Sequence, residues 1–161
     1  MSELSESSGQ QASVAVEHLS VRPDPAGGPH RYRIDVRGHQ VVVDQPEPLG
    51  SDTAPTPTEL WIMGLASCVA FYAGRYCQRH GIDPTGLVVD TDWVMADDRP
   101  ARVARIDVRL TPPPALPAER LPALLAVSRR CTVHNSLEQT PSVTVGAVVR
   151  GQYDPDGRAV D

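Results

Sequence analysis

Residues 56–81 have the sequence TPTELWIMGLASCVAFYAGRYCQRHG, and this stretch decides the fold. It opens with an N-cap threonine, Thr56, a first-turn proline, Pro57, and a carboxylate at the third helical position, Glu59, which together predict the start of a helix. Gly81 suits the left-handed residue that commonly follows the end of a helix. We therefore expect a helix that begins at Pro57 and ends just before Gly81, roughly 36 Å long at about 1.5 Å per residue.

This helix is apolar on nearly every side between Leu60 and Ala73. A helix without a polar face must be covered on most sides, and a chain of 161 residues is short for covering it alone. We infer that a second subunit covers part of the helix. The apolar stretch, about 14 residues, is shorter than the roughly 20 that cross a bilayer, which favours a buried helix over a membrane helix.

Strand patterns flank the helix on both sides. The expected strands are residues 13–19, 32–36, 40–44, 87–95, 103–110 and 142–150. Turns at 37–39 and 96–100 join two of the consecutive pairs into hairpins. A long irregular loop covers 45–55, and a shorter helix covers 121–130. This order of elements, without regular strand–helix alternation, predicts an α+β fold with an antiparallel sheet and a long buried central helix.

The length of the chain fits one domain. We expect residues 1–12 to form a disordered tail, 13–151 a single domain, and 152–161 a polar C-terminal tail. The first residues, MSELSESSGQQ, lack the apolar segment of a signal peptide. Three cysteines in the chain are too few for a secreted disulfide framework. These features favour a cytoplasmic protein.

The charge of the chain argues against two classes of partner. It carries 15 basic and 20 acidic residues, for a formal net charge of -5, and every basic residue is arginine. A nucleic-acid-binding protein needs clustered positive charge, and so does a protein that rests on an anionic membrane. We expect neither nucleic acid nor membrane as a partner.

The cysteines are the candidate reactive groups, because no phosphate-binding loop, nucleophile elbow or metalloprotease motif occurs in the sequence. Cys77 lies nine residues after Cys68 and therefore points to the opposite side of the helix, about 13 Å further along. That exceeds the roughly 7 Å between Cα atoms that a disulfide permits. Cys131 follows the shorter helix and has no such restriction. A free cysteine on an apolar helix is more often a packing residue, so packing and thiol chemistry both stay open at this point.

Two C-x-x-H pairs, residues 77–80 and 131–134, offer four ligands of the kind that zinc prefers. Short Cys/His pairs arise easily by chance, and neither flanking segment looks like a zinc knuckle. A zinc site is therefore the least favoured interpretation, and we expect no metal and no cofactor.

Two segments of the chain resemble a known family. Residues 55–68, PTPTELWIMGLASC, closely resemble the first cysteine motif of the OsmC/Ohr family, the osmotically inducible and organic hydroperoxide resistance proteins. Residues 130–137, RCTVHNSL, are similar to that family's C-P-V-H-x-x-L segment, with Thr132 in place of the proline. The stretch 39–46 and the glycine-containing loop after it are similar to the OsmC-like branch. The resemblance covers about residues 30–150.

This resemblance implies an intertwined homodimer of α+β subunits whose long central helices pack together. It also implies a thiol-dependent peroxidase that reduces organic hydroperoxides, and hydrogen peroxide less efficiently, with an external dithiol as the reductant. Carried over by position, Cys68 is the peroxidatic cysteine, and Cys131 is the resolving cysteine that forms a disulfide with it. No cofactor is implied.

The resemblance also implies an arginine that holds the thiolate of the first cysteine. Arg37 is the candidate, and Arg31 and Arg33 lie close enough in sequence to take its place. The carboxylate that the Ohr branch uses aligns with Thr58, so Glu59 is expected in the helix cap instead. The alternative to a peroxidase is a non-catalytic or redox-responsive dimer of OsmC-like type that binds a small apolar ligand.

Overall fold

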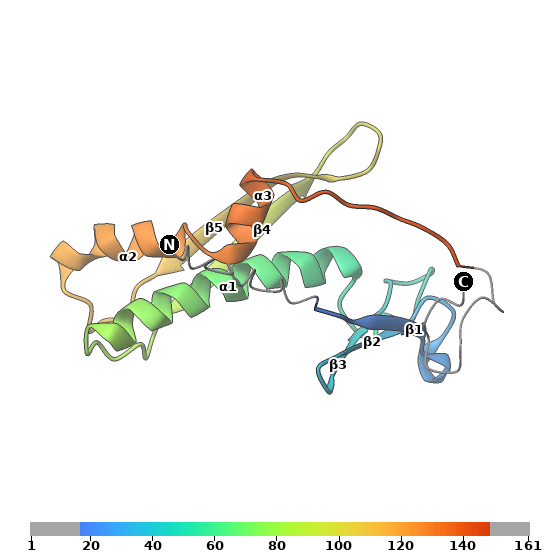
Figure 1. Ribbon diagram of the computed structural model, residues 1–161, viewed down its shortest axis with the longest axis horizontal. Coiled ribbons are helices and arrows are strands. Elements are labelled where there is room, and N and C mark those ends of the chain that lie inside the picture. The colour runs from blue at the N-terminus through green and yellow to red at the C-terminus, as the bar shows by residue number, and fades with distance from the viewer. Residues whose placement is uncertain (1–16, 149–161) are drawn as a thin grey trace, which may run out of the picture. The chain divides into compact units, whose positions relative to one another are not determined.

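The computed structural model describes residues 17–148, and Figure 1 shows their secondary structure along the chain. The expected tails, 1–12 and 152–161, lie outside the described residues. The chain divides into two compact units, one up to Met63 and one from Gly64 onward, which are described separately below. The single domain predicted over 13–151 stays a prediction.

The first unit contains a three-stranded antiparallel sheet in the order β1–β2–β3. Its strands are β1 (Ser20–Pro23), β2 (Tyr32–Val36) and β3 (His39–Val43), and a single 3-10 turn, η1 (Pro25–Gly27), follows β1. The β2–β3 hairpin confirms the prediction for this segment. Its two-residue turn is Arg37-Gly38, with φ values of 48° and 80°, the left-handed pair that a tight hairpin requires.

The first strand differs from the prediction. The expected strand over 13–19 lies partly outside the described residues, and 17–19 carry no strand. β1 begins at Ser20, because the sheet register pairs Ser20 with Asp35 and Pro23 with Tyr32. Pairing with β2, rather than the alternation of apolar residues alone, sets the position of this strand.

Helix α1 (Pro57–Arg79) lies where the sequence predicts it, and it begins in the first unit and continues into the second. A reciprocal capping box starts it: Thr56 Oγ1 accepts the backbone N–H of Glu59 at 3.2 Å, and Glu59 Oε2 accepts the N–H of Thr56 at 2.7 Å. Gly81 adopts a φ of 66° just after the helix. The carboxylate of Glu59 is thus engaged in the cap.

The second unit contains a two-stranded antiparallel hairpin and three short helical elements, besides its part of α1. They are β4 (Val88–Met95), β5 (Val103–Thr111), the 3-10 turn η2 (Ala118–Arg120), α2 (Leu121–Ser128) and α3 (Thr132–Glu138). The inward residues of the hairpin and helices pack against α1 in two clusters. Both hairpins and the long helix confirm the α+β prediction.

The two clusters occupy successive parts of α1. The end cluster has the buried residues Ala73, Tyr76, Cys77 and Leu124. The thiol cluster has the buried residues Leu65, Val69 and Cys131, with Cys68, Tyr72, Val89, Ile106, Val108, Leu110, Val133 and Leu137 packed around them. Both cysteine motifs therefore contribute to the thiol cluster.

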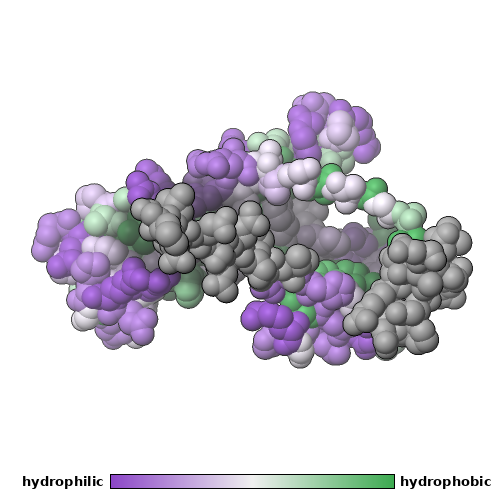
Figure 2. Space-filling view, viewed as in Figure 1, coloured by the Kyte–Doolittle hydropathy of each residue, from purple (hydrophilic) through white to green (hydrophobic). Residues whose placement is uncertain are grey.

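Residues 142–148 form no strand, although the sequence predicts one over 142–150. The valines that suggest a strand are exposed here, Val143 to 80%, Val145 to 92% and Val148 to 57%. In Figure 2, hydrophobic residues recur along this segment. A strand needs a neighbouring strand for its backbone hydrogen bonds, and the described residues pair none with this segment.

Part of α1 is also uncovered. Phe71 is 60% exposed, and Trp61 and Met63 are 42% and 51% exposed. The helix is long and apolar enough to cross a membrane by length and composition alone, a criterion that core helices of soluble proteins also meet. Its contacts with the β4–β5 hairpin and with α2 are those of a core helix.

Candidate active site

Cys68 lies in the middle of α1, half-buried, on the side of the helix that contacts the thiol cluster. Leu65 and Val69, on the same side of the helix, are buried. The helix thus presents this thiol to an apolar environment in which Cys131 also lies.

Cys131 is the N-cap of α3, and its side chain is completely buried. Its Sγ accepts the backbone N–H of His134 at 3.4 Å. The sequence analysis places it at the end of the preceding helix, but α2 ends at Ser128. The cap geometry corrects that assignment, because Cys131 has the extended backbone of an N-cap, with φ −68° and ψ 149°.

The structure packs the side chain of Cys68 against the cluster that contains the buried Cys131, and Cys68 is close enough to perturb the pKa of the Cys131 thiol. Burial raises the pKa of the Cys131 thiol, and the neighbouring Cys68 thiol raises this pKa further. The N–H donated by His134 lowers the pKa in part, because it stabilises the thiolate. Cys131 is therefore a neutral thiol at neutral pH.

Local hydrogen bonds shape the turn that carries Cys131. The ring Nδ1 of His134 lies 2.5 Å from the carbonyl oxygen of Arg129, and Asn135 Nδ2 donates to the carbonyl oxygen of Arg130 at 3.3 Å. Both bonds connect the first turn of α3 to the residues just after α2, so they fix the turn on each side of the thiol.

A further contact joins the elements that carry the two thiols. The hydroxyl of Tyr72, on α1, lies 3.1 Å from the hydroxyl of Thr132, at the start of α3. The sequence analysis does not anticipate this contact, although Tyr72 follows Cys68 by one helical turn and Thr132 follows Cys131 directly.

Cys77 is separated from this pair, as its position on α1 predicts. It is completely buried in the end cluster, and burial raises the pKa of its thiol. The ring of His80 lies against Tyr76, at 4.2 Å between centroids. Within residues 17–148, no group of three or more metal-ligating side chains is assembled, so the two C-x-x-H pairs do not meet in that part of the chain.

The three candidate arginines lie in the first unit and differ in their partners. Arg31 donates to Asp24 at 2.9 Å and to Thr53 at 2.6 Å. Arg33 lies 3.6 Å from a carboxylate oxygen of Asp35. Arg37 is exposed in the β2–β3 turn and has no ion pair among residues 17–148.

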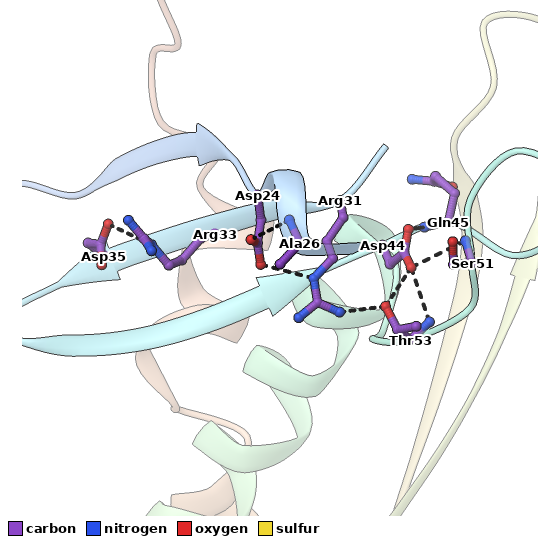
Figure 3. Close-up of polar contacts among 9 residues, drawn as sticks. All are labelled: Asp24, Ala26, Arg31, Arg33, Asp35, Asp44, Gln45, Ser51 and Thr53. Atoms are coloured by element: carbon purple, nitrogen blue, oxygen red, sulfur yellow. Dashed lines mark hydrogen bonds and ion pairs between the residues drawn. The ribbon is translucent and has the colours of Figure 1, made fainter. Parts of the chain in front are cut away.

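A polar cluster that the sequence does not predict surrounds Asp44 at the end of β3 (Figure 3). Its fully buried carboxylate accepts the hydroxyl of Thr53 at 2.7 Å and the backbone N–H groups of Gln45, Ser51 and Thr53. These bonds, led by those from Thr53, lower the pKa of Asp44 to about 2. The carboxylate is thus ionised at neutral pH and holds the loop over 45–55 to the end of the strand.

Gly50 is required in this loop. A Cβ there comes within 2.2 Å of the Gln45 carbonyl oxygen and 2.5 Å of a carboxylate oxygen of Asp44. Asp44 also donates its own N–H to the carbonyl oxygen of Pro55 at 3.1 Å, just ahead of α1. All these contacts are internal, which makes the cluster a structural support for the loop rather than an open site.

The fold and the thiol cluster define a class: α+β proteins with a long central helix and two cysteines in one apolar cluster beside it. The family model described as "OsmC-like protein" matches residues 50–146, more than half of the chain. The protein therefore belongs to the OsmC-like family, which confirms the family expected from the cysteine motifs.

Solved structures share the fold. A Psychrobacter arcticus protein named for osmotic stress induction and detoxification is 23% identical, with a TM-score of 0.66 over 76% of this chain and 89% of that chain. An OsmC-like protein from Mycoplasma pneumoniae is 16% identical, with a TM-score of 0.64 over 78% and 89% of the two chains. The organic hydroperoxide resistance protein OsmC from Legionella pneumophila is 13% identical, with a TM-score of 0.58 over 78% and 91%. Among curated proteins, none matches this sequence.

Proposed function

We propose that the protein is a thiol-dependent peroxidase that reduces organic hydroperoxides, and hydrogen peroxide less efficiently. Cys68 is the peroxidatic cysteine and Cys131 the resolving cysteine. The observation that supports the proposal is the packing of Cys68 and Cys131 in one apolar cluster, although they are far apart in sequence.

The first step oxidises Cys68. Its thiolate attacks one peroxide oxygen, the O–O bond breaks, and the leaving alkoxide takes up a proton to become an alcohol. Cys68 is left as a sulfenic acid. Leu65, Val69 and Val108 in the thiol cluster supply apolar surface that suits the alkyl group of an organic hydroperoxide.

The second step uses Cys131. Its sulfur attacks the sulfenic sulfur of Cys68, an S–S bond forms, and the hydroxyl leaves as water with the thiol proton. An external dithiol then reduces the disulfide by thiol–disulfide exchange and returns both cysteines to the reduced form. Over one cycle, one hydroperoxide and one dithiol become one alcohol, one water and one disulfide.

Arg37 is proposed as the cation that stabilises the Cys68 thiolate. Arg31 and Arg33 already lie beside carboxylates, whereas Arg37 has no ion pair among the described residues. A cation beside a thiol favours the thiolate, which is the reactive form. Replacing Arg37 with Ala is expected to slow the first step more than replacing Arg33 does, as stopped-flow measurements of sulfenic acid formation can test.

The active form is proposed to be a cytoplasmic homodimer. Phe71 on α1 and the valines of residues 142–148 are apolar and exposed in one chain. A second copy that covers α1 and pairs with the valine segment removes both apolar surfaces from water. Sedimentation of the purified protein at micromolar concentration is expected to give twice the mass of one chain.

A coupled assay with cumene hydroperoxide and a dithiol tests the proposed activity. The Cys68→Ser variant is expected to lose turnover, whereas Cys77→Ser, a matched change on the same helix outside the thiol cluster, is expected to keep it. After one equivalent of peroxide, the intact mass of the wild type falls by two hydrogens, and that of Cys131→Ser rises by one oxygen. Unchanged turnover in Cys68→Ser contradicts the mechanism and favours a non-catalytic dimer that binds an apolar ligand.

A further inference from the structure

The contact between Tyr72 and Thr132 connects the same two elements as the thiol pair. Their hydroxyl oxygens lie 3.1 Å apart, within hydrogen-bond distance. On α1, Tyr72 is four residues after Cys68 and shares its face of the helix. On the other side, Thr132 is bonded to Cys131 through the peptide backbone. The contact therefore joins the residue next to Cys131 to the residue one helical turn after Cys68.

We infer that Tyr72 and Thr132 are positioning residues for the resolving step. Their hydrogen bond holds the start of α3 against α1, so that Cys131 stays within reach of the oxidised Cys68. The inference rests on the proposed function and adds two residues to it. Both residues act through the cysteines that they hold.

The other polar contacts of α3 do not perform this task. The bonds made by His134 and Asn135 end on Arg129 and Arg130, so they shape the α2–α3 turn without connecting it to α1. Among residues 17–148, the Tyr72–Thr132 bond is the one side-chain hydrogen bond between α1 and α3. The attachment of α3 to α1 otherwise depends on apolar packing, including that of Val133.

Loss of this bond has a defined chemical consequence. The sulfenic acid on Cys68 either reacts with the Cys131 thiol, releasing water, or with a second hydroperoxide, which gives a sulfinic acid and an alcohol. The first reaction is intramolecular, and its rate depends on how often Cys131 is correctly placed. One net hydrogen bond corresponds to a change of roughly 2- to 10-fold in that placement.

Position 132 allows a variant that removes the hydroxyl without disturbing the backbone. The C-P-V-H-x-x-L segment that this region resembles has proline there, which carries no hydroxyl. Thr132 occupies the first position of α3, where proline is tolerated, and Cys131 already has the extended backbone that must precede a proline. Thr132→Pro therefore removes the hydroxyl from a backbone that accepts the new residue.

The test measures disulfide formation after a single turnover with cumene hydroperoxide, together with the fraction of sulfinic acid in the intact mass. Tyr72→Phe, Thr132→Val and Thr132→Pro are each expected to slow disulfide formation roughly 2- to 10-fold and to increase sulfinic acid. The double variant Tyr72→Phe/Thr132→Val is expected to be no slower than the slower single variant, because both changes remove one bond. Thr132→Ser keeps the hydroxyl and is expected to form the disulfide at about the wild-type rate. Tyr76→Phe, which removes a tyrosine hydroxyl in the end cluster, is the matched control and is expected to leave this rate unchanged.

Wild-type rates in the single variants, or additive losses in the double variant, overturn the inference. A separate measurement, hydroperoxide reduction by the wild type, distinguishes this failure from failure of the proposed function. If the wild type reduces no hydroperoxide, the proposed function fails and the resolving role fails with it. If the wild type reduces hydroperoxide and the variants form the disulfide at the wild-type rate, only the positioning role fails.

Discussion

The backbone N–H of His134 donates to the sulfur of Cys131 at 3.4 Å, so the proposed resolving thiol is also the N-cap of α3. This relationship connects a reactive group to local helix stability. A cap side chain accepts one of the N–H groups that the first turn of a helix leaves without a partner.

Replacing Cys131 with Ala is expected to lower the free energy of unfolding by about 1–2 kcal/mol, through loss of the cap and of buried volume. Cys131→Ser keeps an acceptor in place and is expected to lose less. Denaturant unfolding of both variants under reducing conditions, at one protein concentration, measures the difference. Equal stability of the two variants contradicts a capping role.

The buried thiol of Cys77 predicts a loss of stability at alkaline pH. Burial raises its pKa in the folded protein, so folding favours the neutral form. The stabilisation that this thiol contributes is complete below the unfolded-state pKa of about 8.5 and is lost as the pH rises through the higher folded-state pKa. Unfolding midpoints between about pH 7 and 10 are expected to fall more steeply for the wild type than for Cys77→Ala. If the unfolding midpoints of the wild type and of Cys77→Ala fall in parallel as the pH rises, the raised pKa of Cys77 is contradicted.

Asp44 predicts the opposite behaviour in acid. Its pKa is lowered to about 2, so its contribution is present above the unfolded-state value of about 4 and is lost as the pH falls through about 2. Asp44→Asn is expected to unfold at a lower temperature than the wild type at neutral pH. Its unfolding temperature is also expected to fall less steeply than that of the wild type as the pH is lowered. Asp52→Asn, a change to an exposed aspartate in the same loop, is the control and is expected to retain the wild-type dependence on pH. Thermal unfolding from about pH 5 to 2 tests the pair.

Leu124 anchors α2 in the end cluster and is completely buried. Leu124→Ala is expected to reduce the free energy of unfolding by about 2–5 kcal/mol, because a cavity replaces the lost side chain. Leu49→Ala, at a position that is 64% exposed, provides the comparison and is expected to change stability by less than about 0.5 kcal/mol. Urea denaturation of both variants measures these changes.

Local patterns in the sequence predict much of this fold. The capping box at Thr56 and Glu59 marks the start of α1, and Gly81 marks its end, because each acts within a few residues. The β2–β3 hairpin is equally local, since Arg37 and Gly38 complete its turn. Such features depend little on the rest of the chain.

Features that depend on distant partners are predicted less well. The valines near Val145 have the alternation of a strand, but a strand also requires a partner, and the described residues supply none. Asp44 lies in a stretch with no recognisable motif, and its role emerges only when Ser51 and Thr53 fold back onto it. The family resemblance predicts a pairing of Cys68 with Cys131, and the structure packs both into one cluster. The Tyr72–Thr132 bond, in contrast, depends on three-dimensional contacts alone.

The two tryptophans of the chain, Trp61 and Trp93, are 42% and 37% exposed. One belongs to α1 within the first unit, and the other to β4 in the second. Each unit therefore carries its own intrinsic fluorophore, which is partly exposed to solvent. A Trp61→Phe variant leaves Trp93 as the sole tryptophan, and Trp93→Phe leaves Trp61. The wavelength of the tryptophan emission then reports on the solvation of each unit separately, without any added dye.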